Sequence, residues 1–439
     1  MRVLYRRAAV RVAAAAGAGM LAAGLTAAAG PARAEAAAAR VLAAGRGGAT
    51  VSGTWGTAQE IPGTAGLNAG GFAAVTSVSC ATAGNCSAAG YYVDSAGDQQ
   101  VFVVTQANGA WGTAVKVPGL TSLDNSGIPV VTSVSCGSAG NCSAGGSYQD
   151  GHGHRQVFVV AQANGIWGTA KEVPGTARLN AGGYATVNSV SCATAGNCSA
   201  AGYYADGAGH RQAFVVTQAN GIWGTAKEVP GTARLNTVGA QVNSVSCGAA
   251  GDCSAGGTYS DSGSTSQAFV VTQANGIWGT AKEVPGTAAL NVGGYATVNS
   301  VSCATAGNCS AGGNYQGGTT GEQAFVVTQT NGTWGKAEEV PGTATLNTGG
   351  NAAVNSVSCP SAGNCTAAGY YFGSGGGAFV VTQANGTWGT AQEIPGMASL
   401  APNGGKITSV SCAAANQCSA GGQYGDSADN LQAFVVTES

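Results

Sequence analysis

Five segments of the sequence place a tyrosine two residues before an aspartate, a pairing that can contact a sugar. They are Tyr92 with Asp94, Tyr148 with Asp150, Tyr204 with Asp206, Tyr259 with Asp261, and Tyr424 with Asp426. An aromatic ring offers an apolar platform, and a carboxylate accepts hydrogen bonds from hydroxyl groups. The segments therefore indicate repeated ligand-binding loops. The alternative is structural: the tyrosine fills the rim of a sheet and the aspartate closes a turn in a Gly-rich loop.

Two equivalent segments keep the tyrosine but lack the aspartate. Tyr315 and Tyr371 are followed two residues later by Gly317 and Gly373. The Tyr-x-Asp pattern is therefore repeated but not uniform.

A second group of residues with chemical potential is basic and lies on two of the same loops. The group is His152, His154 and Arg155 in one loop and His210 and Arg211 in the next. Histidine changes charge near neutral pH, so neighbouring loops of this kind predict a pH-sensitive site for an anion. The alternative is loop drift between copied repeats.

The cysteines come in pairs with five residues between them, which predicts small disulfide-closed hairpins. The seven predicted pairs are Cys80 with Cys86, Cys136 with Cys142, Cys192 with Cys198, Cys247 with Cys253, Cys303 with Cys309, Cys359 with Cys365, and Cys412 with Cys418. Zinc is the rival interpretation, but zinc pairs usually have two to four intervening residues and need two further ligands. We therefore predict disulfides, no metal and no cofactor.

Seven repeats must position these residues. Tryptophan recurs every 54 to 56 residues, at Trp55, Trp111, Trp167, Trp223, Trp278, Trp334 and Trp388. In the third cysteine-containing repeat we predict strands at 186–192, 198–204, 212–218 and 222–229, and no helix, because each segment is bounded by Gly, Asn, Asp or Pro. Asn220 and Gly221 predict a type I′ hairpin turn between the last two.

The two ends of the repeated region complete one repeat. The chain ends with a third strand at Phe434, and the region begins with a fourth strand at Trp55. Four-stranded units that close radially form a β-propeller. The sequence thus predicts an all-β, seven-bladed β-propeller over residues 51–439, with a closing blade made of 51–61 and 407–437.

The N-terminus predicts export. Four arginines precede an uncharged stretch from Val12 to Pro31, and Ala32, Arg33 and Ala34 form the small-x-small pattern cut by signal peptidase. We predict a signal peptide over 1–34, a low-complexity leader over 35–50, and a secreted, extracellular protein with no membrane span after cleavage. An uncleaved membrane anchor is the alternative.

Composition limits the partners. Only 8% of the 439 residues are charged, and the chain beyond residue 34 carries a net charge of -7. This balance disfavours nucleic acid. An enzyme is the less favoured interpretation, because its candidate carboxylate pairs, Asp94 with Asp98 or Asp426 with Asp429, lie in Gly- and Ser-rich loops. We therefore predict no catalytic residue.

The segments SVSCATAGNCSAAGYY, SVSCPSAGNCTAAGYY and SVSCAAANQCSAGGQY resemble the V-S-C-x5-C-x-A-x-G repeats of secreted actinobacterial proteins. The resemblance covers residues 51 to 439 and implies a propeller and an extracellular location, but no activity. Together with the repeated loops it leads us to expect a monomeric, non-catalytic binding module of lectin-like or cell-envelope adhesion type, with a glycan or envelope polymer as partner. The alternatives are a glycoside hydrolase, a polysaccharide lyase, or a structural ring that docks another protein.

Overall fold

The computed structural model describes residues 59–438 except 126–127, 262, 264, 374–375, 402–403, 426 and 428–430. The chain divides into two units, Met1–Val51 and Ser52–Ser439, and only the second is described below. The predicted signal peptide and leader, the strand at Trp55, Asp426 and Asp429 lie outside the described residues.

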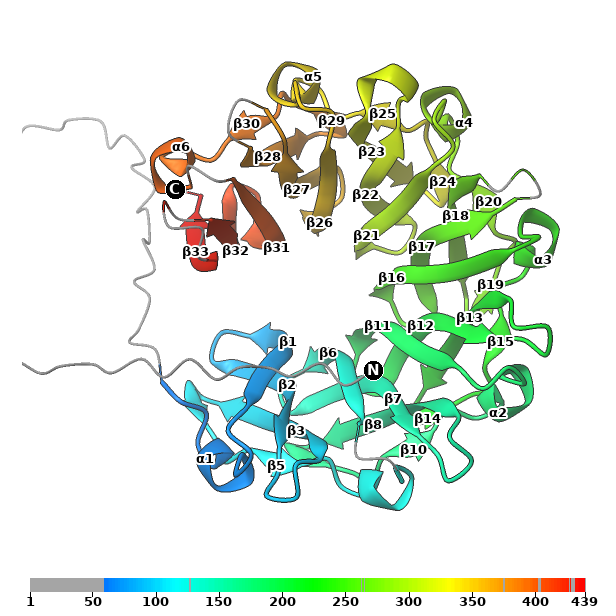
Figure 1. Ribbon diagram of the computed structural model, residues 1–439, viewed down its shortest axis with the longest axis vertical. Coiled ribbons are helices and arrows are strands. Elements are labelled where there is room, and N and C mark those ends of the chain that lie inside the picture. Colours follow the sequence, from blue (N-terminus) through cyan, green and yellow to red (C-terminus); the bar gives the residue numbers. More distant parts are fainter. Residues whose placement is uncertain are drawn as a thin grey trace, which may run out of the picture. The chain divides into compact units, whose positions relative to one another are not determined.

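Each repeat contributes three long antiparallel strands, and we number the repeats from 1 to 7 in chain order (Figure 1). Repeats 1 to 3 contain β1 (Ala73–Thr82), β2 (Asn85–Val93) and β3 (Gln99–Ala107), then β6 (Val130–Ser138), β7 (Asn141–Gln149) and β8 (Arg155–Ala163), then β11 (Ala185–Thr194), β12 (Asn197–Ala205) and β13 (Arg211–Ala219). Repeats 4 and 5 contain β16 (Gly239–Ala249), β17 (Asp252–Ser260) and β18 (Ser266–Ala274), then β21 (Ala296–Thr305), β22 (Asn308–Gln316) and β23 (Glu322–Thr330). Repeats 6 and 7 contain β26 (Ala352–Ser361), β27 (Asn364–Tyr371) and β28 (Gly377–Ala384), then β31 (Gly405–Ala414), β32 (Gln417–Gly425) and β33 (Leu431–Thr437).

The predicted fourth strand is present in repeats 1 to 6 as two short pieces. They are β4 (Ala110–Trp111) and β5 (Val115–Lys116), β9 (Ile166–Trp167) and β10 (Lys171–Glu172), β14 (Ile222–Trp223) and β15 (Lys227–Glu228), β19 (Ile277–Trp278) and β20 (Lys282–Glu283), β24 (Thr333–Trp334) and β25 (Glu338–Glu339), and β29 (Thr387–Trp388) and β30 (Gln392–Glu393). Both pieces pair with the third strand of their repeat. Repeat 7 ends in a three-stranded sheet, β31 to β33, within the described residues.

Single helical turns, which the sequence analysis does not predict, lie in the connections that lead into the first strands. The α-helical turns are α1 (Thr64–Leu67), α2 (Thr176–Leu179), α3 (Thr232–Leu235), α4 (Thr287–Leu290), α5 (Thr343–Leu346) and α6 (Met397–Leu400). A 3-10 turn, η1 (Leu120–Ser122), takes the same place before β6, and a second, η2 (Gly318–Thr320), lies between β22 and β23. In α3 the preceding Gly231 takes a φ of 89°. The hydroxyl of Thr232 then donates to the Val229 carbonyl, which closes the turn.

The Asn-Gly hairpin prediction is confirmed. Asn220 has a φ of 50° and Gly221 a φ of 82°, the positive values that a type I′ turn requires. The equivalent asparagines of the other copies, Asn108, Asn164, Asn275, Asn331 and Asn385, also have positive φ.

The predicted cysteine pairs are bonded in the structure. Each disulfide joins the first two strands of one repeat across a sequence separation of 6, as Cys192 and Cys198 do between β11 and β12. The same pairing recurs from Cys80 with Cys86 to Cys412 with Cys418, and no described cysteine is free. Disulfides in this number indicate an extracellular or otherwise oxidising environment.

The hydrophobic core lies between successive sheets. Between repeats 2 and 3, for example, Val157 and Val159 pack against Val187, Val190 and the rest of one buried cluster. A fully buried phenylalanine on the third strand recurs through repeats 1 to 6, at Phe102, Phe158, Phe214, Phe269, Phe325 and Phe379. Each sheet therefore depends on its neighbour to bury its apolar face.

The Ser-Val-Ser-Cys motif links neighbouring first strands. Ser133 and Ser135 of β6 accept hydrogen bonds from the backbone N–H groups of Val190 and Cys192 in β11. The same two bonds recur at the other described junctions, and the last pair runs from Val410 and Cys412 to Ser356 and Ser358. The small serines thus act as connectors between repeats.

At four junctions between described repeats, a partly buried threonine accepts a hydrogen bond from the tryptophan of the next repeat. Thr217 accepts hydrogen bonds from the Trp278 indole and the Gln273 amide. In repeat 2 the equivalent residue is Ala161, and the buried indole nitrogen of Trp223 has no partner. A buried donor without a partner costs about 1–3 kcal/mol.

We therefore expect Ala161→Thr to raise the free energy of unfolding by about 1 kcal/mol, because the new hydroxyl would accept from Trp223. Denaturant unfolding monitored by tryptophan fluorescence measures the change. The matched control is Thr217→Ala, which should lower the free energy by about 1–2 kcal/mol because it recreates the defect at Trp278. A destabilised Ala161→Thr variant would show that the junction cannot take the extra atoms.

Candidate functional site

The tyrosines of the Tyr-x-Asp segments are buried beneath the loops. Tyr148 and Tyr204 are each 3% exposed. Their hydroxyl groups donate to Glu172 and Glu228, at 3.1 and 3.3 Å, so each tyrosine connects the second strand of its sheet to the fourth. Burial, followed by the charge of Glu172, raises the pKa of Tyr148 above its ordinary value. The same bond joins Tyr259 to Glu283 and Tyr315 to Glu339.

The aspartates of these segments hold their own loops. One oxygen of Asp206 accepts from the backbone N–H groups of Ala208 and His210, and the other accepts from the amide of Gln212. Asp94 and Asp150 make the same contacts with their own loops. In Asp261 the second oxygen accepts from the hydroxyl of Thr265 instead.

These hydrogen bonds favour the charged carboxylate. In Asp206, slight burial raises the pKa, but the bonds from Gln212, His210 and Ala208 outweigh it and the pKa lies below its ordinary value. For Asp261 the Thr265 hydroxyl is the main cause of a lowered pKa. A carboxyl group that stays ionised in this way is a poor proton donor.

The tyrosine rings of the Tyr-x-Asp segments leave little surface for contact with a sugar. The rings of Tyr92, Tyr148, Tyr204 and Tyr259 are buried, and Tyr424 is only partly exposed. The aspartates already accept several hydrogen bonds from their own loops. The geometry agrees with the structural alternative, in which the tyrosine fills the sheet and the aspartate closes a turn.

Two of the three predicted histidines, His154 and His210, lie beside the aspartate of their own loop. The Nδ1 atom of His154 is 3.9 Å from an Asp150 oxygen, and that of His210 is 3.8 Å from an Asp206 oxygen. His152 stacks against His154 with ring centroids 6.2 Å apart. The two arginines of the group turn toward tyrosine rings, Arg155 over Tyr184 and Arg211 over Tyr203.

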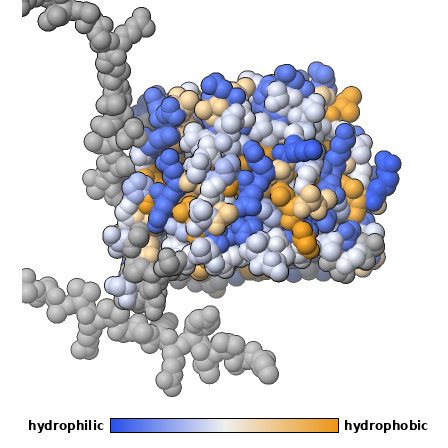
Figure 2. Space-filling model, turned by 90° about the horizontal axis from the view of Figure 1, so that it is seen from above, coloured by the Kyte–Doolittle hydropathy of each residue, from blue (hydrophilic) through white to orange (hydrophobic). Residues whose placement is uncertain are grey.

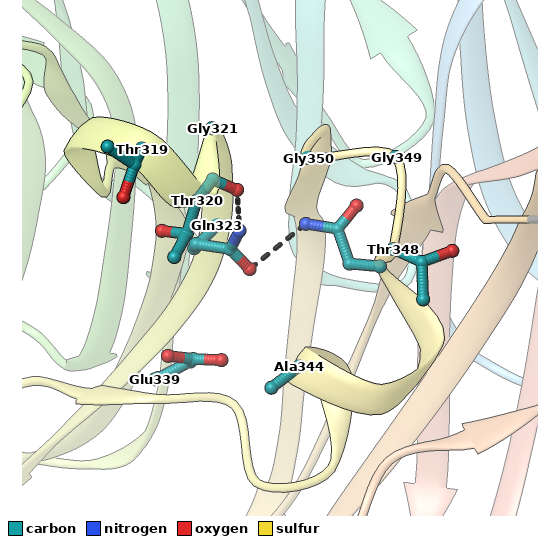
Figure 3. A pocket seen from close by; sticks show the side chains of 10 residues that line it. Thr319, Thr320, Gly321, Gln323, Glu339, Ala344, Thr348, Gly349 and Gly350 are labelled. Atoms are coloured by element: carbon teal, nitrogen blue, oxygen red, sulfur yellow. Dashed lines mark hydrogen bonds between the residues drawn. The ribbon is translucent and has the colours of Figure 1, made fainter.

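A cavity of about 430 Å³ lies between repeats 5 and 6, where the loop aspartate is absent. Gly317 has no carboxylate, and the Gln323 amide donates to the carbonyl of Thr320 instead. Figure 3 shows Gln323 and Glu339 on one side of this cavity and Thr348 and Gly350 on the other. Its lining is mainly polar.

A second cavity, of about 420 Å³, lies between repeats 6 and 7 and contains aromatic side chains. Tyr370 and Phe372 line it with their rings edge to face, 6.4 Å apart. Phe372 is 50% exposed, and Lys406 and Gln423 add a cation and an amide. We call this the Tyr370 pocket.

One polar atom on the wall of the Tyr370 pocket has no hydrogen-bond partner, and a partly buried carboxylate lies next to it in the sheet. The buried Oδ1 atom of Asn351, on the pocket wall, has no hydrogen-bond partner. Glu322 pairs with Asn351 in a parallel bridge. Burial raises the pKa of Glu322. The pKa of Tyr370 is also raised, first by burial and then by the charge of Glu322. A ligand that donates a hydrogen bond to Asn351 would satisfy an atom that the fold leaves unpaired.

Sequence reasoning missed both cavities, although it contained a signal for them. The loop aspartate is replaced by Gly317 and Gly373, and these are the repeats where the cavities lie. The departures from the repeat, rather than the repeat, indicate the candidate site. On the face shown in Figure 2, apolar side chains are dispersed among polar ones.

The described ranges contain no candidate metal site. No group of three or more His, Cys, Asp or Glu side chains there could hold a metal ion. Of the four carboxylates considered for catalysis, Asp94 accepts hydrogen bonds from its own loop, including one from the backbone N–H of Asp98, and Asp426 and Asp429 lie outside those ranges. Within the same ranges no helix has the length and apolar character that a membrane crossing needs.

Comparison with known proteins gives distant likenesses. No protein-family model matches the chain, and neither does any curated protein. The Hadza microbial sialidase Hz136 is 11% identical with a TM-score of 0.37, over 73% of this chain and 65% of the sialidase. A PL25 ulvan lyase is 11% identical with a TM-score of 0.45, over 82% and 91%. The BP39L lectin from Burkholderia pseudomallei is 15% identical with a TM-score of 0.42, over 83% and 95%. Likenesses at this level carry no conclusion about this chain.

Proposed function

We propose that the protein is a secreted, non-catalytic binding module that takes a glycan in the Tyr370 pocket. The observation that carries the proposal is the pair of aromatic rings, Tyr370 and Phe372, beside the unpaired amide oxygen of Asn351. Aromatic faces contact the apolar faces of sugars, and an amide oxygen accepts from a hydroxyl. The repeated Cys-x5-Cys disulfides support an extracellular setting and membership of the actinobacterial repeat proteins that the sequence resembles.

The proposal includes closure of the repeats into a seven-bladed propeller. At inner junctions, valines of one first strand pack on a small residue of the preceding sheet, as Val298 and Val301 do on Gly256. The corresponding valines of β1, Val75 and Val78, are 49% and 57% exposed. Contact of β1 with the face of β32 around Gly421 would bury them in the same way.

The serine connectors support the same closure. Ser409 and Ser411 of β31 are equivalent to the serines that, in the other repeats, accept hydrogen bonds from the first strand of the following repeat. Their counterparts would be the backbone N–H groups of Val78 and Cys80. The two end strands thus carry complementary groups, as a ring requires.

A glycan array probed with the mature protein tests the function. We expect binding, and we expect Phe372→Ala to weaken it roughly tenfold, because an aromatic contact is worth ~0.5–1.5 kcal/mol. Phe72→Ala is the matched control, since Phe72 is a similarly exposed aromatic, 57% accessible, in repeat 1. A blank array at high protein concentration, or equal losses in the two variants, would contradict the proposed site.

A further inference from the structure

Two arginines and two tyrosines form a cluster where repeat 2 meets repeat 3. The Arg155 guanidinium lies 5.5 Å from the centre of the Tyr184 ring, and that of Arg211 lies 4.7 Å from the centre of the Tyr203 ring. The two rings stack on each other, with centroids 5.9 Å apart and an interplanar angle of 18°. We call these four side chains the arginine–tyrosine cluster.

The strands fix this cluster in place. Arg155 begins β8 and pairs with Tyr184 in a parallel bridge, while Tyr203 and Arg211 lie on the adjacent strands β12 and β13. A guanidinium group that lies on an aromatic face is already held in one orientation. It therefore loses less side-chain entropy when it binds a ligand. The cluster is thus preorganised by the backbone rather than by flexible loops.

The two guanidinium groups lack acidic partners. Arg155 donates through Nε to the hydroxyl of Ser147, and Arg211 donates to the amide oxygen of Gln241. Across the described parts of the chain, the ion pairs within 4.0 Å are those of His154 and His210, and neither involves an arginine. The positive charge of both arginines therefore remains available to an anion.

A cavity adjoins the cluster. It has a volume of about 160 Å³ and is lined by Arg155 and Tyr184 together with Tyr148, Gln149, Gly153 and Ile128. Pockets for drug-sized ligands are larger, at roughly 300–1,000 Å³. The cavity therefore suits one small polar group, and Tyr184, which is 44% exposed, offers part of its ring beside it.

We propose that the arginine–tyrosine cluster binds the carboxylate of a uronic-acid residue, so that the ligand of the protein is an acidic polysaccharide. Guanidinium groups recognise carboxylates through paired charge-assisted hydrogen bonds, and the exposed part of the Tyr184 ring contacts the sugar. This inference rests on the proposed glycan-binding function and adds a second, separate contact region to the Tyr370 pocket.

Calorimetric titration with tetragalacturonate, and with cellotetraose as the neutral probe, tests the inference. We expect tetragalacturonate to bind and Arg155→Gln or Arg211→Gln to weaken its binding about tenfold each, the loss expected for a charge-assisted contact. Tyr184→Ala should weaken it too. The matched controls are Arg178→Gln and Arg234→Gln, which remove the same charge from exposed helical turns of the same region and should change binding less than about twofold.

Thermal melting of each variant separates binding from folding, and all four arginine variants should melt close to the wild type. Equal losses in the cluster and control variants would overturn the inference in favour of diffuse surface charge. So would cellotetraose binding as tightly as tetragalacturonate, or no tetragalacturonate binding at all. If Phe372→Ala abolishes tetragalacturonate binding while the cluster variants bind normally, the cluster is not the acid site and the proposed function stands.

Discussion

Deleting residues 51–62 is expected to cost at least about 3 kcal/mol of unfolding free energy and to make the protein aggregate. The reason is closure: the strand predicted at Trp55 would pair with β33, and its loss would leave the edge of the last sheet open. The deletion also removes Ile61 and Pro62, which contact repeat 1. Calorimetry and light scattering measure the two effects.

Deleting residues 35–50 is the control for this experiment. That segment contains no predicted strand and no cysteine, so its removal should leave the melting temperature almost unchanged. If both truncations melt alike and remain monomeric with all disulfides formed, the termini do not close a ring.

The second large effect is expected at a glycine of the second strand. Gly202 lies opposite a bulge in β11, between Val187 and Ser189. A Cβ atom on Gly202 would lie 2.0 Å from the backbone oxygen of Thr186, a distance that real Cβ atoms do not reach. We expect Gly202→Ala to destabilise the protein by about 3 kcal/mol, because a strand rather than a side chain must move. Chemical denaturation measures the loss.

Gly207→Ala is the matched control, because a Cβ atom there would have only an ordinary contact, 3.7 Å from the Ala181 side chain. Its effect should stay within about 0.5 kcal/mol. The close approach recurs at one glycine in every repeat: Gly90, Gly146, Gly257, Gly313, Gly369 and Gly422. An equal response of the two variants would mean that the bulge relaxes at no cost.

Local features of the fold could be predicted from the sequence because they depend on neighbouring residues. The Asn220-Gly221 turn and the Cys192–Cys198 pairing belong to short hairpins whose chemistry is complete within a few residues. The sequence does not predict the helical turn at Thr232, because the proline and glycine before it usually indicate a loop. The bond that stabilises the turn, from the Thr232 hydroxyl to the Val229 carbonyl, is seen only in the structure.

The candidate site was less predictable because its residues are set by contacts between repeats. The sequence shows Tyr204 beside Asp206, but not that Glu228 returns on the fourth strand to bury the tyrosine hydroxyl. Likewise Arg155 and Tyr184 belong to different repeats. They come together only because the start of β8 pairs with the residue just before β11. The residues that all repeats share therefore predict the strands and turns, whereas the residues that differ between repeats form the pockets.

The short span of each disulfide has a consequence for how the chain matures. Fourteen thiols allow a very large number of pairings, yet each bonded pair is separated by only six positions in the chain. Ring closure is entropically easiest over such short spans, so each cysteine meets its correct partner more often than any distant one. In an oxidising environment, each hairpin can therefore be oxidised on its own, without help from the other repeats. The protein should therefore reach its native pairing after complete reduction with little dependence on disulfide isomerases.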